Sequence, residues 1–150
     1  MSRTWSFSVT ETASATPETV YAVLSDVAGW ATWAPGVNRA VLEHRGEPSP
    51  TGPGAIRKLG RPGFYVREKI LATDPPHLQS YTVLSGLPVK DYRGDVELHP
   101  DGDATRIDWR GSFGVKVPGT GPILQRLLRS TIAKTASALA REAERKESAG

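Results

Sequence analysis

The sequence predicts an α+β fold in which a curved antiparallel sheet of about seven strands wraps around one long C-terminal helix. Stretches that alternate apolar and polar residues recur along residues 5–117, and turn-forming residues separate them. A long amphipathic segment begins near residue 122. The 15 glycines and 12 prolines in 150 residues also suit many strand ends and turns, and they argue against an all-helical bundle.

The first elements are one strand and two short helices. Residues 5–11 alternate large apolar with small polar side chains, which is the period of a half-buried strand. The segment Thr16-Pro17-Glu18 supplies an N-cap, a proline for the first helical position and an acidic first turn. Apolar residues at helical spacing continue to Val27, so a short helix follows the first strand. The cluster around Trp30 and Trp33 predicts a second short helical turn.

The rest of the sheet and the long helix follow from the remaining pattern. Extended segments are expected at residues 37–44, 55–59, 64–72, 78–84, 90–99 and 105–117. The last helix is expected from about residue 122 to about residue 146, with an apolar stripe of Leu124, Leu128, Ile132, Ala136, Leu139 and Ala143. Because the stripe is partly alanine towards its C-terminal half, we expect the helix to leave an internal cavity in the sheet there.

Composition narrows the class of protein. The length and the 38% hydrophobic content predict one domain, residues 1–150. No cysteine is present, which excludes a disulfide scaffold, a thiolate metal site and a cysteine nucleophile. The N-terminus has no signal-peptide pattern and no apolar run reaches 18 residues, so we expect a soluble, cytoplasmic protein without an integral membrane segment.

The net charge of +3 does not predict a nucleic-acid partner. Residues 1–119 carry 13 basic and 13 acidic side chains, whereas residues 120–150 carry 6 basic and 3 acidic ones. The excess is therefore confined to the C-terminal segment, where basic and acidic residues are interleaved as on the solvated face of a helix. The sequence leaves the oligomeric state open, a homodimer included.

The order of elements and several motifs resemble a known superfamily. The motifs are residues 14–21, Gly54-Ala55-Ile56-Arg57, Arg67-Glu68-Lys69-Ile70 with Asp74-Pro75-Pro76, and Asp91-Tyr92-Arg93-Gly94. With this element order, the chain resembles the START-like, birch-pollen-allergen-like helix-grip superfamily, and within it the bacterial polyketide cyclase/dehydrase and lipid transport (SRPBCC) family. The resemblance covers residues 5–145 and implies a bacterial protein with a cavity for a hydrophobic ligand between sheet and helix.

Glu68 is the first candidate for a functional side chain. It shares an inward row with Phe64, Val66 and Ile70, and a carboxylate among apolar neighbours needs a partner or a proton. Arg57, in a row of the preceding strand, is placed to reach it. Two interpretations remain open: an ion pair that only sets strand register, or polar anchors for a ligand carbonyl, hydroxyl or carboxylate.

The resemblance and the strand alternation add further candidates. Plant hormone receptors of the superfamily are similar in having an arginine, a glutamate and a tyrosine at positions that match Arg57, Glu68 and Tyr92, which implies that these groups face the ligand. Asp91 stands where those receptors have asparagine and their gate sequence is missing, so hormone sensing is not implied. Alternation also directs Tyr81, Trp109, Phe64 and Phe113 inward, and the apolar stripe of the long helix adds Leu124 and Leu128.

Three functions are compatible with these residues. The first is binding of a small hydrophobic, partly oxygenated molecule such as a lipid, isoprenoid or polyketide. The second is catalysis as a polyketide cyclase/aromatase or dehydratase, with Glu68 as acid or base and Arg57 or Tyr92 stabilising an enolate oxygen. The third, supported only by the basic helix, is a protein-interaction module. We expect no cofactor and no metal, because His44, His77 and His99 lack the spacing of metal ligands.

Overall fold

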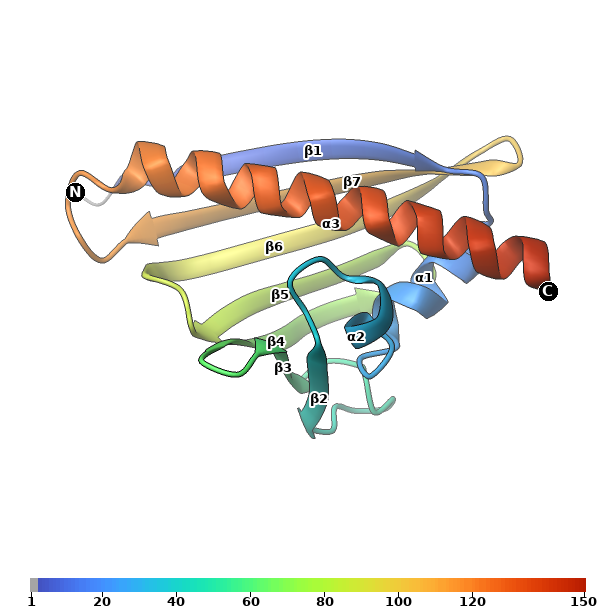
Figure 1. Cartoon of the computed structure of the whole chain (residues 1–150), viewed down its shortest axis with the longest axis horizontal. Helices are drawn as coiled ribbons and strands as arrows, with labels where there is room; N and C mark the ends of the chain where they lie inside the picture. The colour runs from blue at the N-terminus through green and yellow to red at the C-terminus, as the bar shows by residue number, and fades with distance from the viewer. Residues whose placement is uncertain (1–2) are drawn as a thin grey trace.

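The computed structural model describes residues 3–150 and confirms the predicted fold class (Figure 1). The elements are β1 (Trp5–Ala13), α1 (Pro17–Ser25), α2 (Trp30–Trp33), β2 (Arg39–His44), β3 (Ile56–Arg61), β4 (Phe64–Asp74), β5 (Leu78–Ser85), β6 (Val89–Asp101), β7 (Ala104–Val115) and α3 (Gly121–Ala149). All neighbouring strands are antiparallel, in the order β1-β7-β6-β5-β4-β3-β2. Relative to the expected bounds, β1 and α3 extend further and β7 ends earlier.

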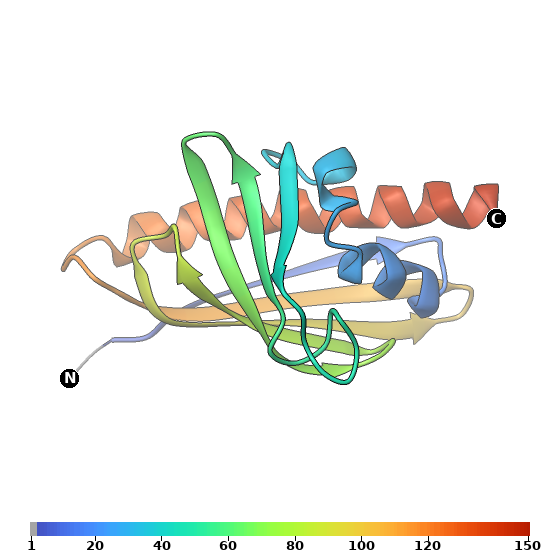
Figure 2. The same ribbon diagram turned by 90° about the horizontal axis from the view of Figure 1, so that it is seen from below.

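The sheet bends strongly around the long helix. Strands β1, β7 and β6 run along α3, whereas β2, β3 and β4 run across that direction (Figures 1 and 2). Helix α3 packs against β1 and β7, and α1 and α2 lie beside its C-terminal half. The sheet and helix therefore enclose a space that α1 and α2 close at one end.

The two short helices form for local reasons. The Thr16 hydroxyl accepts a hydrogen bond from the Thr19 backbone N–H at 3.3 Å, and Pro17 occupies the first turn of α1, as the sequence predicts. The indole of Trp30 in α2 then donates to the Leu24 carbonyl oxygen at 2.9 Å. This bond ties α2 to the end of α1.

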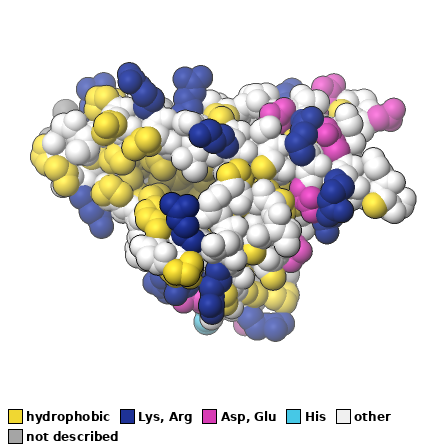
Figure 3. Space-filling model, in the orientation of Figure 1, with side chains coloured by type: hydrophobic (Ala, Val, Ile, Leu, Met, Phe, Trp, Pro, Cys, Tyr) yellow, Lys and Arg dark blue, Asp and Glu magenta, His cyan; other side chains and the backbone are white. Residues whose placement is uncertain are grey.

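Acidic side chains of α3 bind the backbone that leads into α1. The carboxylates of Glu144 and Glu147 accept hydrogen bonds from the backbone N–H groups of Ser14, at 2.9 Å, and Thr16, at 3.2 Å. Hydrogen bonds from Thr19 and Thr16 lower the pKa of Glu147. Acidic side chains accordingly gather towards the C-terminal half of α3 (Figure 3). They anchor that half to the corner between β1 and α1.

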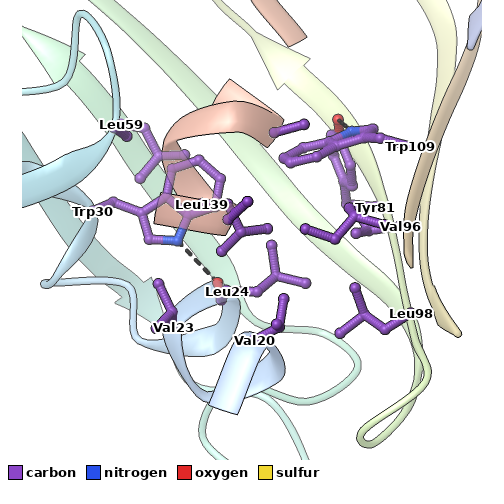
Figure 4. Close-up of a cluster of buried hydrophobic side chains, with 14 of the residues drawn as sticks. Val20, Val23, Leu24, Trp30, Leu59, Tyr81, Val96, Leu98, Trp109 and Leu139 are labelled. Carbon is purple, nitrogen blue, oxygen red and sulfur yellow. Dashed lines mark hydrogen bonds between the residues drawn. The ribbon is translucent and has the colours of Figure 1, made fainter. Parts of the chain in front are cut away.

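The core lies between α1, the C-terminal half of α3 and the inner face of the sheet (Figure 4). It includes Val20 and Leu24 of α1, Leu98 of β6 and Leu139 of α3, each at most 1% exposed. Ala136, Ala140 and Ala143 of α3 are buried here, because their small side chains let the helix approach β1 and α1 closely. The predicted position of the cavity, beneath the alanine-rich half of the helix, is therefore wrong.

The outer faces of β6 and β7 carry rows of opposite charge. Arg110 and Glu97 form an ion pair across the two strands. Arg93 and Arg106 instead pair along their own strands, with Asp95 at 3.3 Å and Asp108 at 3.2 Å. Glu97 and Asp108 lie opposite each other in the ladder, and each is balanced by an arginine, so these residues have a structural explanation.

Candidate ligand-binding cavity

A cavity of about 560 Å³ lies between the N-terminal half of α3 and the inner face of the sheet. Its lining comprises Trp30, Ala34, Pro35, Gly36, Val37, Leu59, Gly60, Arg61, Phe64, Val66, Glu68, Tyr81, Val83, Leu87, Pro88, Tyr92, Trp109, Leu124, Leu127, Leu128, Thr131, Ile132 and Thr135. The volume lies within the range of small-molecule sites. Since Phe64 is 52% exposed and Leu127 is 57% exposed, the cavity opens to solvent at these residues.

Arg57 and Glu68 form the predicted pair. They face each other in the β3–β4 ladder, and Arg57 Nε donates to Glu68 Oε1 at 2.8 Å. Nη1 donates to Gln79 Oε1 at 3.3 Å, while Nη2 lies 2.8 Å from Glu68 Oε1 without the geometry of a hydrogen bond. The guanidinium carbon also lies 4.8 Å from the centre of the Trp30 ring. Arg57 is thus enclosed on several sides.

The position of Arg57 differs from that expected for a ligand contact. Its side chain is 2% exposed and does not line the cavity, because Glu68, Gln79 and the Trp30 ring surround the guanidinium. Glu68 does line the cavity and is 14% exposed. Among residues 3–150, the contacts to this carboxylate all involve Oε1. Oε2 is therefore available as a hydrogen-bond acceptor, held in place by the arginine behind it.

Two buried tyrosines supply a second polar group. Trp109 Nε1 donates to the Tyr81 hydroxyl oxygen at 3.0 Å, and the hydroxyl oxygens of Tyr81 and Tyr92 are 3.1 Å apart. Either hydroxyl can be the donor in this contact. One of the two hydroxyl protons is therefore used between the tyrosines, and the other has no acceptor among the described residues and is free to donate to a group in the cavity.

Both tyrosines stay protonated under ordinary conditions. Burial raises the pKa of Tyr81 and of Tyr92 well above the ordinary value, and the charge of Glu68 acts in the same direction. With Trp109 donating to Tyr81, the tyrosine pair therefore supplies one O–H donor to the cavity that Glu68 also lines.

The remaining predicted residues divide into two groups. Trp109, Phe64, Leu124 and Leu128 line the cavity, as do Tyr81 and Tyr92. Phe113 points inward as predicted but does not line the cavity. It is 1% exposed and lies opposite Trp5 in the β1–β7 ladder, so core packing covers it.

Some lining residues are not among the candidate site residues. The loop after α2, residues 34–37, closes one side of the cavity next to Trp30. Thr131 and Thr135 also line it, and the Thr135 hydroxyl donates to the Thr131 carbonyl at 2.9 Å. Their spacing of four residues beside Leu124 and Leu128 is a signal that could have identified them.

Within residues 3–150, no group of three or more His, Cys, Asp or Glu side chains is arranged to hold a metal ion. No helix there is long and apolar enough to cross a membrane.

The family model described as polyketide cyclase/dehydrase and lipid transport matches residues 4–144, nearly the whole chain. The chain belongs to this family. No curated protein matches the sequence.

Solved structures share the fold. A START superfamily protein from Mycobacterium smegmatis is 20% identical, with a TM-score of 0.79 over 93% of this chain and 97% of that one. Zhui aromatase/cyclase from Streptomyces sp. R1128 is 20% identical, with a TM-score of 0.77 over 96% of both chains. A protein from Thermobifida fusca is 26% identical, with a TM-score of 0.75 over 95% of this chain and 93% of that one. These similarities confirm the helix-grip fold.

Proposed function

We propose that the protein binds a hydrophobic, partly oxygenated small molecule in the cavity beneath α3. The observation that carries this proposal is the combination of apolar walls with two polar groups that line the same cavity, the Glu68 carboxylate and the hydroxyl of Tyr92. Burial of the ligand's apolar part supplies affinity at about 25 cal/mol per Å². The two polar groups set the ligand's orientation.

The polar groups also indicate which oxygen function the ligand carries. Glu68 Oε2 accepts a hydrogen bond, so it fits a ligand hydroxyl, and the Tyr92 O–H fits a carbonyl or a second hydroxyl oxygen. A ligand carboxylate is disfavoured at this end, because Arg57 already neutralises Glu68 and contributes no further cation to the cavity. We therefore expect hydroxylated or phenolic lipids, isoprenoids or polyketides to bind more tightly than fatty acids of similar size.

Native mass spectrometry of the freshly purified protein tests this proposal, followed by solvent extraction of any adduct and by titration of tryptophan fluorescence with paired alcohols and acids. We expect an oxygenated hydrophobic adduct and a preference for the alcohols. Tyr92→Phe weakens binding of the oxygenated ligand by about tenfold. Tyr65→Phe, which removes a hydroxyl outside the cavity, is the matched control. Equal binding of alcohols and acids, or equal effects of the two variants, would contradict the assignment.

A second candidate function is cyclisation of a polyketide. The observation that favours it is that a carboxylate oxygen and a phenolic donor face the same cavity, so one group can take a proton while the other stabilises an enolate oxygen. A dry cavity that holds a reactive poly-β-ketone in a folded conformation would supply much of the catalysis by positioning. Turnover of a cyclisable polyketide by the Glu68→Gln variant tests it, because undiminished turnover would exclude Glu68 as the acid or base.

A further inference from the structure

Large apolar side chains are exposed around the mouth of the cavity. They are Phe64 at the start of β4, Val117 in the loop before α3, and Ile123 and Leu127 of α3, between 52% and 61% exposed. We call these four residues the mouth patch. Phe64 and Leu127 line the cavity opening, and Ile123 is one turn of helix from Leu127 on the same side. Figure 3 shows hydrophobic side chains gathered over the N-terminal half of α3.

The segments that carry the mouth patch are basic and free of acidic residues. Residues 48–67, 75–90 and 109–141 contain no Asp or Glu. Four exposed cations lie on these segments beside the patch: Arg61 in the cavity lining, Lys116 next to Val117, Arg126 next to Leu127, and Lys134 two helical turns after Leu127. Within residues 3–150, none of the four forms an ion pair.

We propose that the mouth patch docks on the surface of an anionic lipid bilayer. The apolar side chains would enter the boundary between headgroups and acyl chains, and the four cations would contact lipid phosphates. A contiguous exposed apolar area with basic flanks fits a surface that is apolar just beneath an anionic layer. Because Phe64 and Leu127 of the patch line the cavity opening, docking would let a hydrophobic ligand pass between bilayer and cavity without crossing water, a consequence that rests on the proposed function.

The charges argue against a second copy of this chain as the occupant. A symmetric dimer through the mouth patch would bring Lys116, Arg126 and Lys134 of one copy towards the same residues of the other, with no acidic side chain on these segments to balance them. An anionic surface removes that repulsion. The binding should therefore weaken as the salt concentration rises.

Flotation of the purified protein with lipid vesicles tests the proposal. We expect binding to vesicles of phosphatidylcholine mixed with phosphatidylglycerol, and little binding to phosphatidylcholine alone. The double variant Arg126→Glu/Lys134→Glu lowers the affinity for the mixed vesicles by about tenfold or more. The matched control is Arg45→Glu/Lys69→Glu, which makes the same change of charge at exposed positions away from the mouth patch. Equal loss in the control, or no preference for anionic vesicles, would overturn the proposal.

A second pair of variants tests the apolar part. Val117→Ser/Ile123→Ser lowers vesicle binding, whereas Leu71→Ser, at an apolar residue that is 39% exposed on β4, leaves it unchanged. A dimer in wild-type protein that Val117→Ser/Ile123→Ser dissociates would instead assign the patch to a second copy and overturn the proposal. Vesicle binding is measured without added ligand. A protein that binds ligand but no vesicles refutes docking alone, and one that binds vesicles but no ligand refutes the proposed function alone.

Discussion

Replacing Glu68 by glutamine tests how much the buried ion pair contributes to stability. The substitution keeps the size of the side chain and an oxygen for Arg57 Nε, but it leaves the Arg57 cation, which is 2% exposed, without a counter-charge. At the observed 2.8 Å, two unit charges attract each other by about 6 kcal/mol for an effective dielectric constant of about 20. Two contributions offset part of this lost attraction. The glutamine oxygen still accepts a hydrogen bond from Arg57, and the variant no longer has to remove a charged carboxylate from water when it folds. We therefore expect a net loss of about 3 kcal/mol.

Urea unfolding followed by tryptophan fluorescence measures this loss, and thermal unfolding should show a decrease in Tm of about 6–12 °C. The chain offers a matched control in Glu43→Gln, which removes the carboxylate from an ion pair with Arg67. That pair has a similar separation of 2.7 Å, but its side chains are 33% and 41% exposed. Exposed pairs contribute about 0–1 kcal/mol, so the control should change stability little.

A double variant separates stability from ligand recognition. Arg57→Met/Glu68→Leu replaces the pair by apolar side chains of similar size, which should restore most of the stability that Glu68→Gln loses. It also removes the only carboxylate in the cavity lining, so the preference for hydroxylated ligands should disappear. A loss below about 1 kcal/mol for Glu68→Gln would refute the reasoning, since the pair would then behave like an exposed one.

Three further perturbations follow from the cavity and its hydroxyl chain. Gly94→Ala would place a methyl carbon 2.7 Å from the Tyr81 hydroxyl oxygen. Because Tyr92 and Trp109 hold the Tyr81 ring in place, the free energy of unfolding in urea should fall by about 2–3 kcal/mol. An unchanged free energy of unfolding would show that the ring can move. Above pH 10 the folded protein retains the Tyr81 and Tyr92 protons, whereas the unfolded chain releases them. The free energy of unfolding should therefore fall by up to about 1.4 kcal/mol per pH unit for each tyrosine. This dependence on pH should be weaker in the Tyr92→Phe variant. Leu128→Trp fills the cavity and should lower ligand affinity about tenfold in fluorescence titration; unchanged affinity would place the ligand elsewhere.

The sequence predicted the sheet, the helices and the Arg57–Glu68 pair because each depends on local periodicity. Alternation places Glu68 among inward residues, and the register of two adjacent strands then brings Arg57 opposite it. The capping pattern of Thr16 and Pro17 is equally local. Such features need no knowledge of distant contacts.

Other features of the site depend on how distant elements pack. The cavity lies beneath the leucines of α3 because α1 and α2 fill the space beneath its alanines, and only the tertiary structure shows which half of the helix they cover. The same packing encloses Arg57 behind Glu68 and joins Trp109, Tyr81 and Tyr92 through their polar atoms. The sequence by itself therefore determined which side chains face inward. Which of them reach the cavity was decided by the tertiary structure, because the distance between two packed elements depends on the side chains of both.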